Sequence, residues 1–192
     1  MDRKSFIKSS VTTIGALAFI PLVNACNNNP AKEKSTDQVS SFKETSPKPK
    51  IVRNQEGLKL NVLGDNQTIK LAGKDTNGKF TLIEELNNPG TGIPPHIHEN
   101  EDEIFNVLEG EMELTVGQET TILKAGDLAF GPRGIPHSWK IIGDKKAKVI
   151  LSIFPSGIEY MFEELSKLPL GPPDFKKVSE ICSKYQVTFV NS

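Results

Sequence analysis

Several features that would point to common functional classes are scarce in this sequence. Its 192 residues contain two cysteines, Cys26 and Cys182, which is too few for a disulfide framework. The 23 basic and 24 acidic residues nearly cancel, to a net charge of −1, so we expect no nucleic-acid partner. The most apolar segment, residues 11–23, is too short to span a bilayer. Histidine is also rare, and its three occurrences carry most of the functional argument.

The first 25 residues have the features of an export signal. A basic start precedes the apolar segment, which ends at Ala25-Cys26. Residues 23–26 resemble a bacterial lipobox, in which the cysteine carries the lipid and becomes the first residue of the mature protein. A plain cleaved signal peptide is the alternative. The resemblance implies a signal peptide over residues 1–25, lipidation of Cys26, and export to the periplasm or cell envelope with the lipid anchor as the membrane contact.

Composition divides the remaining chain into three parts. Residues 26–50 hold almost no apolar side chains and cannot bury enough surface to fold, so we expect a flexible linker. From 51 to 155, short apolar runs alternate with turn signals, which is the pattern of a single all-β barrel or sandwich. Expected strands cover residues 58–63, 68–71, 80–86, 104–108, 112–116, 121–123, 128–130, 138–142 and 149–154, with residues 64–66 as a turn.

The apolar period changes to a helical one beyond Pro155. Two amphipathic stretches predict two short helices, the second capped by Asp174, in a C-terminal extension over residues 156–192. We expect them to pack on the barrel exterior or on another subunit, which leaves a homodimer open. Cys182 lies on the second apolar stripe and is expected to be an inert buried thiol.

The three histidines occur in two similar segments. His96 and His98 are two residues apart, so on a strand they would point to the same face. A polar turn follows, and Glu103 then begins the next apolar run. His137 follows a turn rich in glycine and proline, as the first pair does. Three imidazoles and a carboxylate predict a metal site; the alternative is an ordinary set of half-buried histidines.

The same residues match the two sequence motifs of the cupin superfamily. The first motif is carried by Gly90, His96, His98, Glu103 and Gly110, and the second by Gly126, Pro132, Gly134 and His137. The second motif usually ends in an asparagine that is not a ligand, where this chain has Ile141. The match covers about residues 56–155. The ending, Phe154-Pro155 followed by residues 159–165 and a second short helix, resembles the small bacterial cupins named quercetin dioxygenase-like. The resemblance implies a double-stranded β-helix, or jelly-roll barrel, with metal ligands His96, His98, Glu103 and His137.

The ligand set leaves the identity of the metal open. Imidazole and carboxylate ligands accommodate divalent iron, manganese, nickel, cobalt, copper and zinc. Glu101 and Asp102 adjoin Glu103, and we expect them to form a solvated acidic turn. Strand alternation points several apolar side chains into the barrel, most of them as core packing. The candidates for substrate contact among them are Phe105, Met112, Trp139 and Ile141.

Three functions are compatible with such a site. The resemblance implies first a metal-dependent dioxygenase acting on a small enol or phenolic substrate, with Glu103 as both ligand and proton acceptor. The second is an anchored protein that binds a small sugar-like molecule or organic acid through the metal without chemistry. The third is a metal-dependent isomerase or hydrolase, which would need a further inward acid or base. Glu84 or Glu85 could supply it, but the pattern does not decide which of them points inward.

Overall fold

The computed structural model describes residues 46–169 and 171–190. The expected export signal, Cys26 and most of the expected linker lie outside these residues. Within them, no helix combines the length and apolar character needed to cross a membrane.

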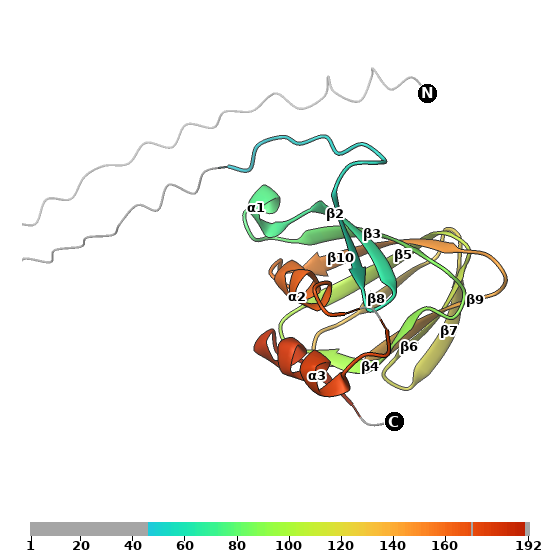
Figure 1. Cartoon of the computed structure of the whole chain (residues 1–192). Coiled ribbons are helices and arrows are strands. Elements are labelled where there is room, and N and C mark those ends of the chain that lie inside the picture. The colour runs from blue at the N-terminus through green and yellow to red at the C-terminus, as the bar shows by residue number, and fades with distance from the viewer. Residues whose placement is uncertain (1–45, 170, 191–192) are drawn as a thin grey trace, which may run out of the picture. The chain divides into compact units, whose positions relative to one another are not determined.

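The described residues form two antiparallel sheets that face each other (Figure 1). The first sheet has the order β1 (Leu58–Val62), β2 (Asp65–Leu71), β3 (Thr81–Asn87), β10 (Ala147–Phe154), β5 (Asp102–Glu109) and β8 (Leu128–Gly131). The second has the order β11 (Val187–Phe189), β4 (Gly92–His98), β9 (His137–Ile142), β6 (Glu111–Val116) and β7 (Glu119–Lys124). A single-turn helix, α1 (Gly73–Thr76), links β2 to β3. The predicted all-β class and double-stranded β-helix are confirmed.

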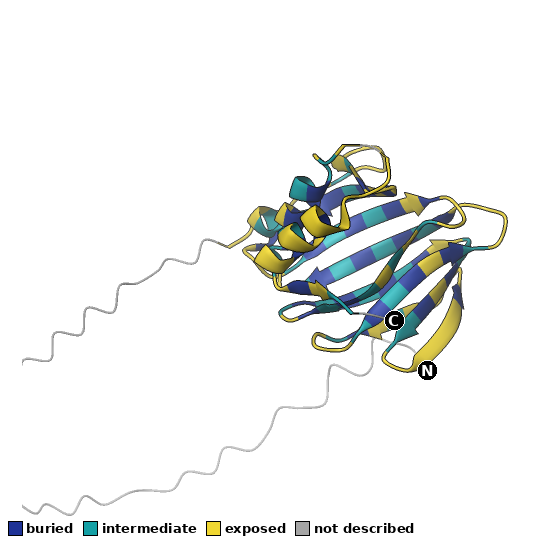
Figure 2. Ribbon diagram, turned by 60° about the horizontal axis from the view of Figure 1, so that its bottom comes forward, coloured by how far each residue is buried: buried dark blue, intermediate teal, exposed yellow. Residues whose placement is uncertain are grey.

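The core lies between the two sheets and follows from strand alternation. Every second residue of β10 is buried, and β5 and β3 keep the same alternation over most of their length (Figure 2). The side chains with no exposed surface include Ile83, Phe105, Val107, Met112, Val149 and Ile153. Burial of each large apolar side chain contributes about 1.5–3 kcal/mol, so this layer supplies much of the folding free energy.

Gly110 shows why one motif position must be glycine. It joins β5 of the first sheet to β6 of the second, with a φ of +78°, a conformation that side chains disfavour. A Cβ atom at this position would lie 2.6 Å from the carbonyl oxygen of Lys146 and 2.7 Å from the Cα of Ala147. The chain can therefore pass from one sheet to the other here only with glycine.

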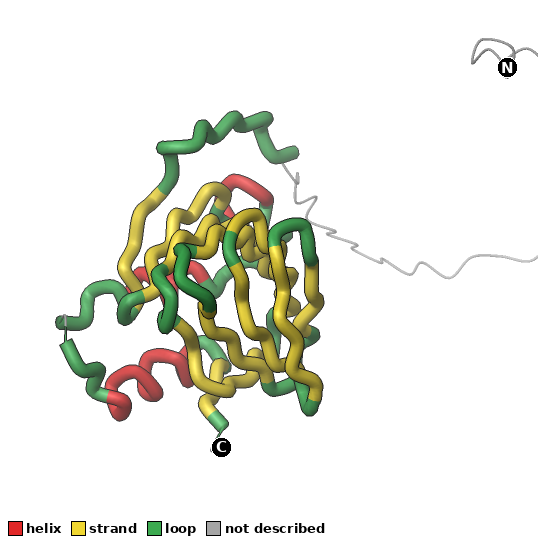
Figure 3. The backbone as a smooth tube through the Cα atoms, turned by 90° about the vertical axis from the view of Figure 1, so that its right-hand side faces the viewer, coloured by secondary structure: helices red, strands yellow, loops and turns green. Residues whose placement is uncertain are grey.

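The two predicted C-terminal helices are present as α2 (Glu159–Leu165) and α3 (Phe175–Lys184). Asp174 caps α3 as predicted, because its side chain accepts hydrogen bonds from the amides of Lys176 and Lys177. The helices contact each other and lie together at one end of the two sheets (Figures 1 and 3).

The expected place of these helices on the barrel exterior is wrong. Met161 and Leu165 of α2, and Val178 and Cys182 of α3, line the cavity inside the barrel. The helices therefore close one end of the barrel with their apolar faces. The chain then adds β11, a three-residue strand that the sequence analysis missed, which pairs with the edge of β4.

Replacing isoleucine with alanine should lower the free energy of unfolding more in the core than on the surface. Ile83 is fully buried, and Ile83→Ala should lower the free energy of unfolding by about 2–5 kcal/mol because it leaves a cavity. Ile122 on β7 is 50% exposed, and Ile122→Ala should cost less than about 1 kcal/mol. Urea unfolding followed by tryptophan fluorescence measures both; equal losses would contradict the described core.

Candidate metal centre

Strand pairing brings two of the three histidines face to face. His96 on β4 and His137 on β9 are direct Cα partners in the antiparallel ladder, and their ring centroids lie 4.3 Å apart. His98 follows His96 by two residues on β4, so its side chain points to the same face. All three side chains are buried, with 7% exposure or less. The register of one strand pair therefore sets the positions of all three imidazoles.

The turn before β9 is attached to the end of β4. The amide of Gly134 donates a hydrogen bond of 2.8 Å to the carbonyl oxygen of His98, from a backbone φ of +74° that glycine adopts without strain. This contact joins the second histidine segment to the first immediately ahead of His137. The glycine and proline residues that marked a turn in the sequence thus hold the two halves of the site together.

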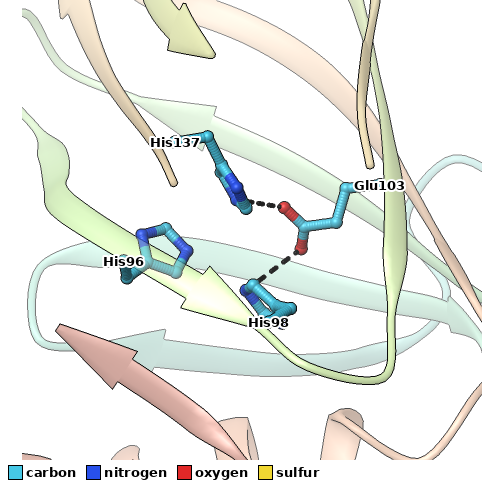
Figure 4. Close-up of side chains that lie close together, drawn as sticks. All are labelled: His96, His98, Glu103 and His137. Carbon is cyan, nitrogen blue, oxygen red and sulfur yellow. Dashed lines mark hydrogen bonds and ion pairs between the residues drawn. The ribbon is translucent and has the colours of Figure 1, made fainter. Parts of the chain in front are cut away.

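Glu103 reaches the histidines from the opposite sheet. It lies on β5 and is 3% exposed, and its Oε2 is 2.9 Å from Nε2 of His137. Its Oε1 is 3.8 Å from Nε2 of His98 (Figure 4). One ligand atom from each of these four residues lies within 4.8 Å of the other three. The structure therefore brings together all four side chains that the sequence predicted as ligands.

The other ring nitrogen of each histidine faces an oxygen. Nδ1 of His96 is 3.0 Å from the carbonyl oxygen of Pro94, and Nδ1 of His137 is 3.3 Å from that of Ile135. Nδ1 of His98 lies 3.5 Å from a carboxylate oxygen of Glu101. Metal-binding histidines commonly orient the ring in this way, which leaves Nε2 for the metal. The donor set and its orientation fit a divalent transition metal.

The local electrostatics favour the unprotonated forms of two ligands. Burial, together with His137 and His98, lowers the pKa of His96 to about 3. Burial would raise the pKa of Glu103, but the surrounding histidines lower it to about 2. For His98, burial is outweighed by Glu103 and Glu101, which raise its pKa. Metals bind neutral imidazole and ionised carboxylate, so metal binding would compete with the proton that Glu103 and Glu101 favour on His98.

The expected solvated acidic turn beside the ligands is wrong for Glu101. Its side chain is 7% exposed, and its carboxylate faces Nδ1 of His98. Asp102 points the other way and forms a two-pronged ion pair with Arg133, with distances of 3.1 and 2.7 Å. Neither is among the four clustered ligand residues. This difference is not visible in the sequence, because the two carboxylates are adjacent in a polar stretch.

A cavity of about 70 Å³ adjoins the cluster and includes His96, His98 and Glu103 in its lining. Of the residues predicted to contact substrate, Trp139 lines this cavity. The other three are packed in the apolar core and absent from the lining: Phe105, Met112 and Ile141. Cys182 is buried, and burial raises its pKa to about 11, so its thiol stays protonated.

The opposite wall of the cavity carries three polar residues, of which the sequence indicated only Glu85, as one of two alternatives. Asp65, Gln67 and Glu85 line it from β2 and β3, and each is 3% exposed or less. Asp65 had been expected in a turn, but β2 begins at this residue, and the turn consists of Leu63 and Gly64. Extension of the alternation from Ile83 would have identified Glu85, and not Glu84, as the inward residue.

Comparison with known proteins supports the interpretation of the motifs. The family model described as a cupin domain matches residues 84–154. Quercetin 2,3-dioxygenase from Bacillus subtilis is 31% identical over 93 residues, which cover 48% of this chain and 28% of that protein. The HTH-type transcriptional regulator PuuR from Escherichia coli is 32% identical over 106 residues, covering 55% of this chain and 57% of the regulator.

Other matches cover more of the compared protein. An uncharacterized protein from Aquifex aeolicus is 31% identical over 114 residues, 59% of this chain and 85% of that protein. Among solved structures, KdgF from Halomonas sp. has a TM-score of 0.52 at 21% identity and covers 58% of this chain and 99% of its own. A predicted oxalate decarboxylase from Thermotoga maritima has a TM-score of 0.51 at 24% identity, covering 55% and 99%. These two structures share the fold.

The ligand assignment predicts complete loss of stoichiometric metal. His96→Ala, His98→Ala and His137→Ala each remove one ligand and leave the remaining groups in an incomplete site. Elemental analysis of the purified variants, with circular dichroism to establish that they fold, measures the effect. Equal and negligible metal in the wild type and all three variants would contradict the metal site.

Glu101 should influence metal affinity through His98 without being a ligand. Glu101→Gln removes the charge that faces Nδ1 of His98 and should weaken metal binding by about tenfold to a hundredfold. Asp102→Asn, one residue along but paired with Arg133, is the matched control and should keep wild-type affinity. Competition with a chromogenic chelator gives both constants. A loss in Asp102→Asn equal to that in Glu101→Gln would contradict the described orientation.

Proposed function

The chain belongs to the cupin superfamily, and we propose that it is a metal-dependent dioxygenase acting on a small enol or phenolic substrate. The observation that carries the proposal is the convergence of His96, His98, Glu103 and His137 beside an internal cavity. A closed structural site would have no reason to adjoin a cavity, whereas a catalytic site needs an accessible position next to its ligands.

The bound metal would supply Lewis acidity toward an enol or phenolate oxygen and a place for dioxygen. The protein supplies the remaining groups. Glu103 has one carboxylate oxygen close to His137 and the other directed toward His98, so it would hold the metal together with the histidines. Its further role as acceptor of the substrate hydroxyl proton is the one that the family resemblance implies. Trp139 and the helices α2 and α3 keep bulk water from the reacting oxygens.

The cavity volume restricts the substrate class. The cavity has room for a few ordered water molecules or for one small organic molecule. This favours small enols and enediols over a three-ring flavonol, although the similarity to quercetin 2,3-dioxygenase supports dioxygen chemistry as such. The chain spans 28% of that enzyme and 57% of the PuuR regulator, and these relatives have different functions. The activity is therefore argued from the site.

Two other functions have support from particular observations. A cavity lined in part by α2 and α3 also suits a protein that retains a small ligand through its metal without converting it. The inward position of Glu85 favours a metal-dependent isomerase or hydrolase, which needs an acid or base that is not a ligand. The proposed lipid anchor on Cys26 is compatible with all three, and would place the activity in the cell envelope.

Dioxygen uptake separates these functions. The full chain, loaded with one divalent metal at a time, should consume dioxygen with at least one small enediol or catechol, and Glu103→Gln should lower the turnover number by about a hundredfold or more. Asp102→Asn is the matched control and should keep its rate. Turnover without dioxygen would favour the isomerase or hydrolase. Retained ligand without turnover by any metal form would favour the binding protein, and either result contradicts the dioxygenase.

A further inference from the structure

The wall of the cavity opposite the histidines contains a buried polar network. Asp65 accepts a hydrogen bond of 2.7 Å from Nε2 of Gln67 and one of 2.6 Å from Nδ2 of Asn87. Asn87 in turn accepts a hydrogen bond of 2.8 Å from the amide of Asn66. These bonds fix the orientation of the Gln67 amide, with its nitrogen toward Asp65 and its oxygen left over. The network therefore satisfies the amide nitrogen of Gln67 but leaves its oxygen without a hydrogen-bond partner.

Two atoms of this wall have no hydrogen-bond partner among the described residues. They are Oε1 of Gln67 and Oε2 of Glu85, and their side chains are 3% and 2% exposed. Gln67 and Glu85 are direct Cα partners across β2 and β3, so the two side chains stand next to each other. Both line the cavity that also contains His96, His98 and Glu103. An unpaired polar atom in an apolar interior costs free energy, which a bound polar group would recover.

The chemistry of the two groups indicates what they would bind. The oxygen of Gln67 can only accept a hydrogen bond. Burial, together with Asp65 and Glu103, raises the pKa of Glu85 well above its ordinary value, so this carboxyl keeps its proton and can donate. A hydroxyl group donates one hydrogen bond and accepts another, and so complements both. An anionic group would lack a proton for Gln67 and would face the nearby Asp65 and Glu103.

We propose that Glu85 and Gln67 form a hydroxyl-binding subsite on the sheet that faces the three histidines. The substrate is then a small α-hydroxy carbonyl compound with a further neutral hydroxyl group at its far end. Its carbonyl oxygen and adjacent hydroxyl oxygen face the metal ligands, and the far hydroxyl bonds to Glu85 and Gln67. This inference rests on the proposed metal site and narrows its substrate class; the small cavity agrees with it.

The neighbouring Glu84 provides a matched control. Its side chain lies on the other face of β3, where its carboxylate is 3.1 Å from Nζ of Lys148 and 3.7 Å from Nζ of Lys70. Glu84→Gln therefore changes the same residue type one position away without changing the cavity. Glu85→Met removes the carboxyl at nearly constant volume, and Glu85→Gln keeps one donor and one acceptor. Gln67 is left unchanged, because its replacement would also release Asp65.

Binding is measured on the full chain loaded with zinc, which has no redox chemistry, so the result does not depend on dioxygen. The two probes are dihydroxyacetone and hydroxyacetone, which share the metal-binding hydroxy ketone and differ in the far hydroxyl group. Calorimetry should give the wild type an affinity for dihydroxyacetone about tenfold higher, or about 1.4 kcal/mol. The symmetry of dihydroxyacetone alone accounts for roughly a twofold difference. Glu85→Met should reduce the ratio to this value, whereas Glu84→Gln should keep it and Glu85→Gln should keep part of it.

Three results would overturn the subsite. They are an affinity ratio of dihydroxyacetone to hydroxyacetone of two or less in the wild type, binding of neither ketone, and an unchanged ratio in Glu85→Met. The unpaired atoms would then be satisfied by water alone. A second measurement separates a structural role. Glu85→Met removes an unpaired buried atom, so its melting temperature should equal or exceed that of the wild type. A clearly lower melting temperature of Glu85→Met would overturn the proposal. This test does not require metal binding, so it also applies if the wild type binds no metal. Selective binding without dioxygen uptake would support the subsite and contradict only the dioxygenase.

Discussion

The rest of the structure depends on the burial of three imidazoles and one carboxylate at a single point. Ionisable groups in an apolar interior are unfavourable unless they are paired or bound to a metal. Here the carboxylate of Glu103 faces His98 and His137, and backbone carbonyls or Glu101 occupy the far side of every ring. That arrangement needs two strands of one sheet and one of the other to meet in fixed register. The double-stranded β-helix provides this meeting point.

The sequence predicted these ligands because their spacing encodes the register. His96 and His98 share a face by strand alternation alone, and glycine-rich turns fix where β4 and β9 begin and end. The sequence did not single out Asp65 and Gln67 of the opposite wall, because they are ordinary polar residues of a strand. Glu84 and Glu85 were named as alternatives, and which of them points inward was left undecided. A register shift between Ile69 and Leu71 further disturbs the alternation of β2. Only the fold places this wall across from the histidines.

The C-terminal segment shows the same limit at a larger scale. The apolar stripes of α2 and α3 were evident from their helical period, and so was the cap at Asp174. What the stripes cover is decided by the tertiary structure. An apolar stripe in the sequence shows that a helix is buried on one side, but not whether it packs on the outer face of the barrel or over its open end. β11 was missed because a three-residue strand is shorter than any periodic signal. Its Phe189 nevertheless lines the cavity and lies 6.1 Å from the ring of His96.

The two walls of the cavity therefore have different origins. One is built from the residues of the cupin motifs and accounts for the metal ligands that the family pattern implies. The other comes from β2 and β3, which precede both motifs. Asp65 and Gln67 also lie outside the matched family region, residues 84–154, whereas Glu85 lies within it. A metal with open positions can support oxygenation, isomerisation or simple binding. The polar groups that face it decide which molecule is held there and in what orientation. The residues that distinguish the ligand of this protein from those of related cupins should accordingly be Gln67 and Glu85, and not the histidines.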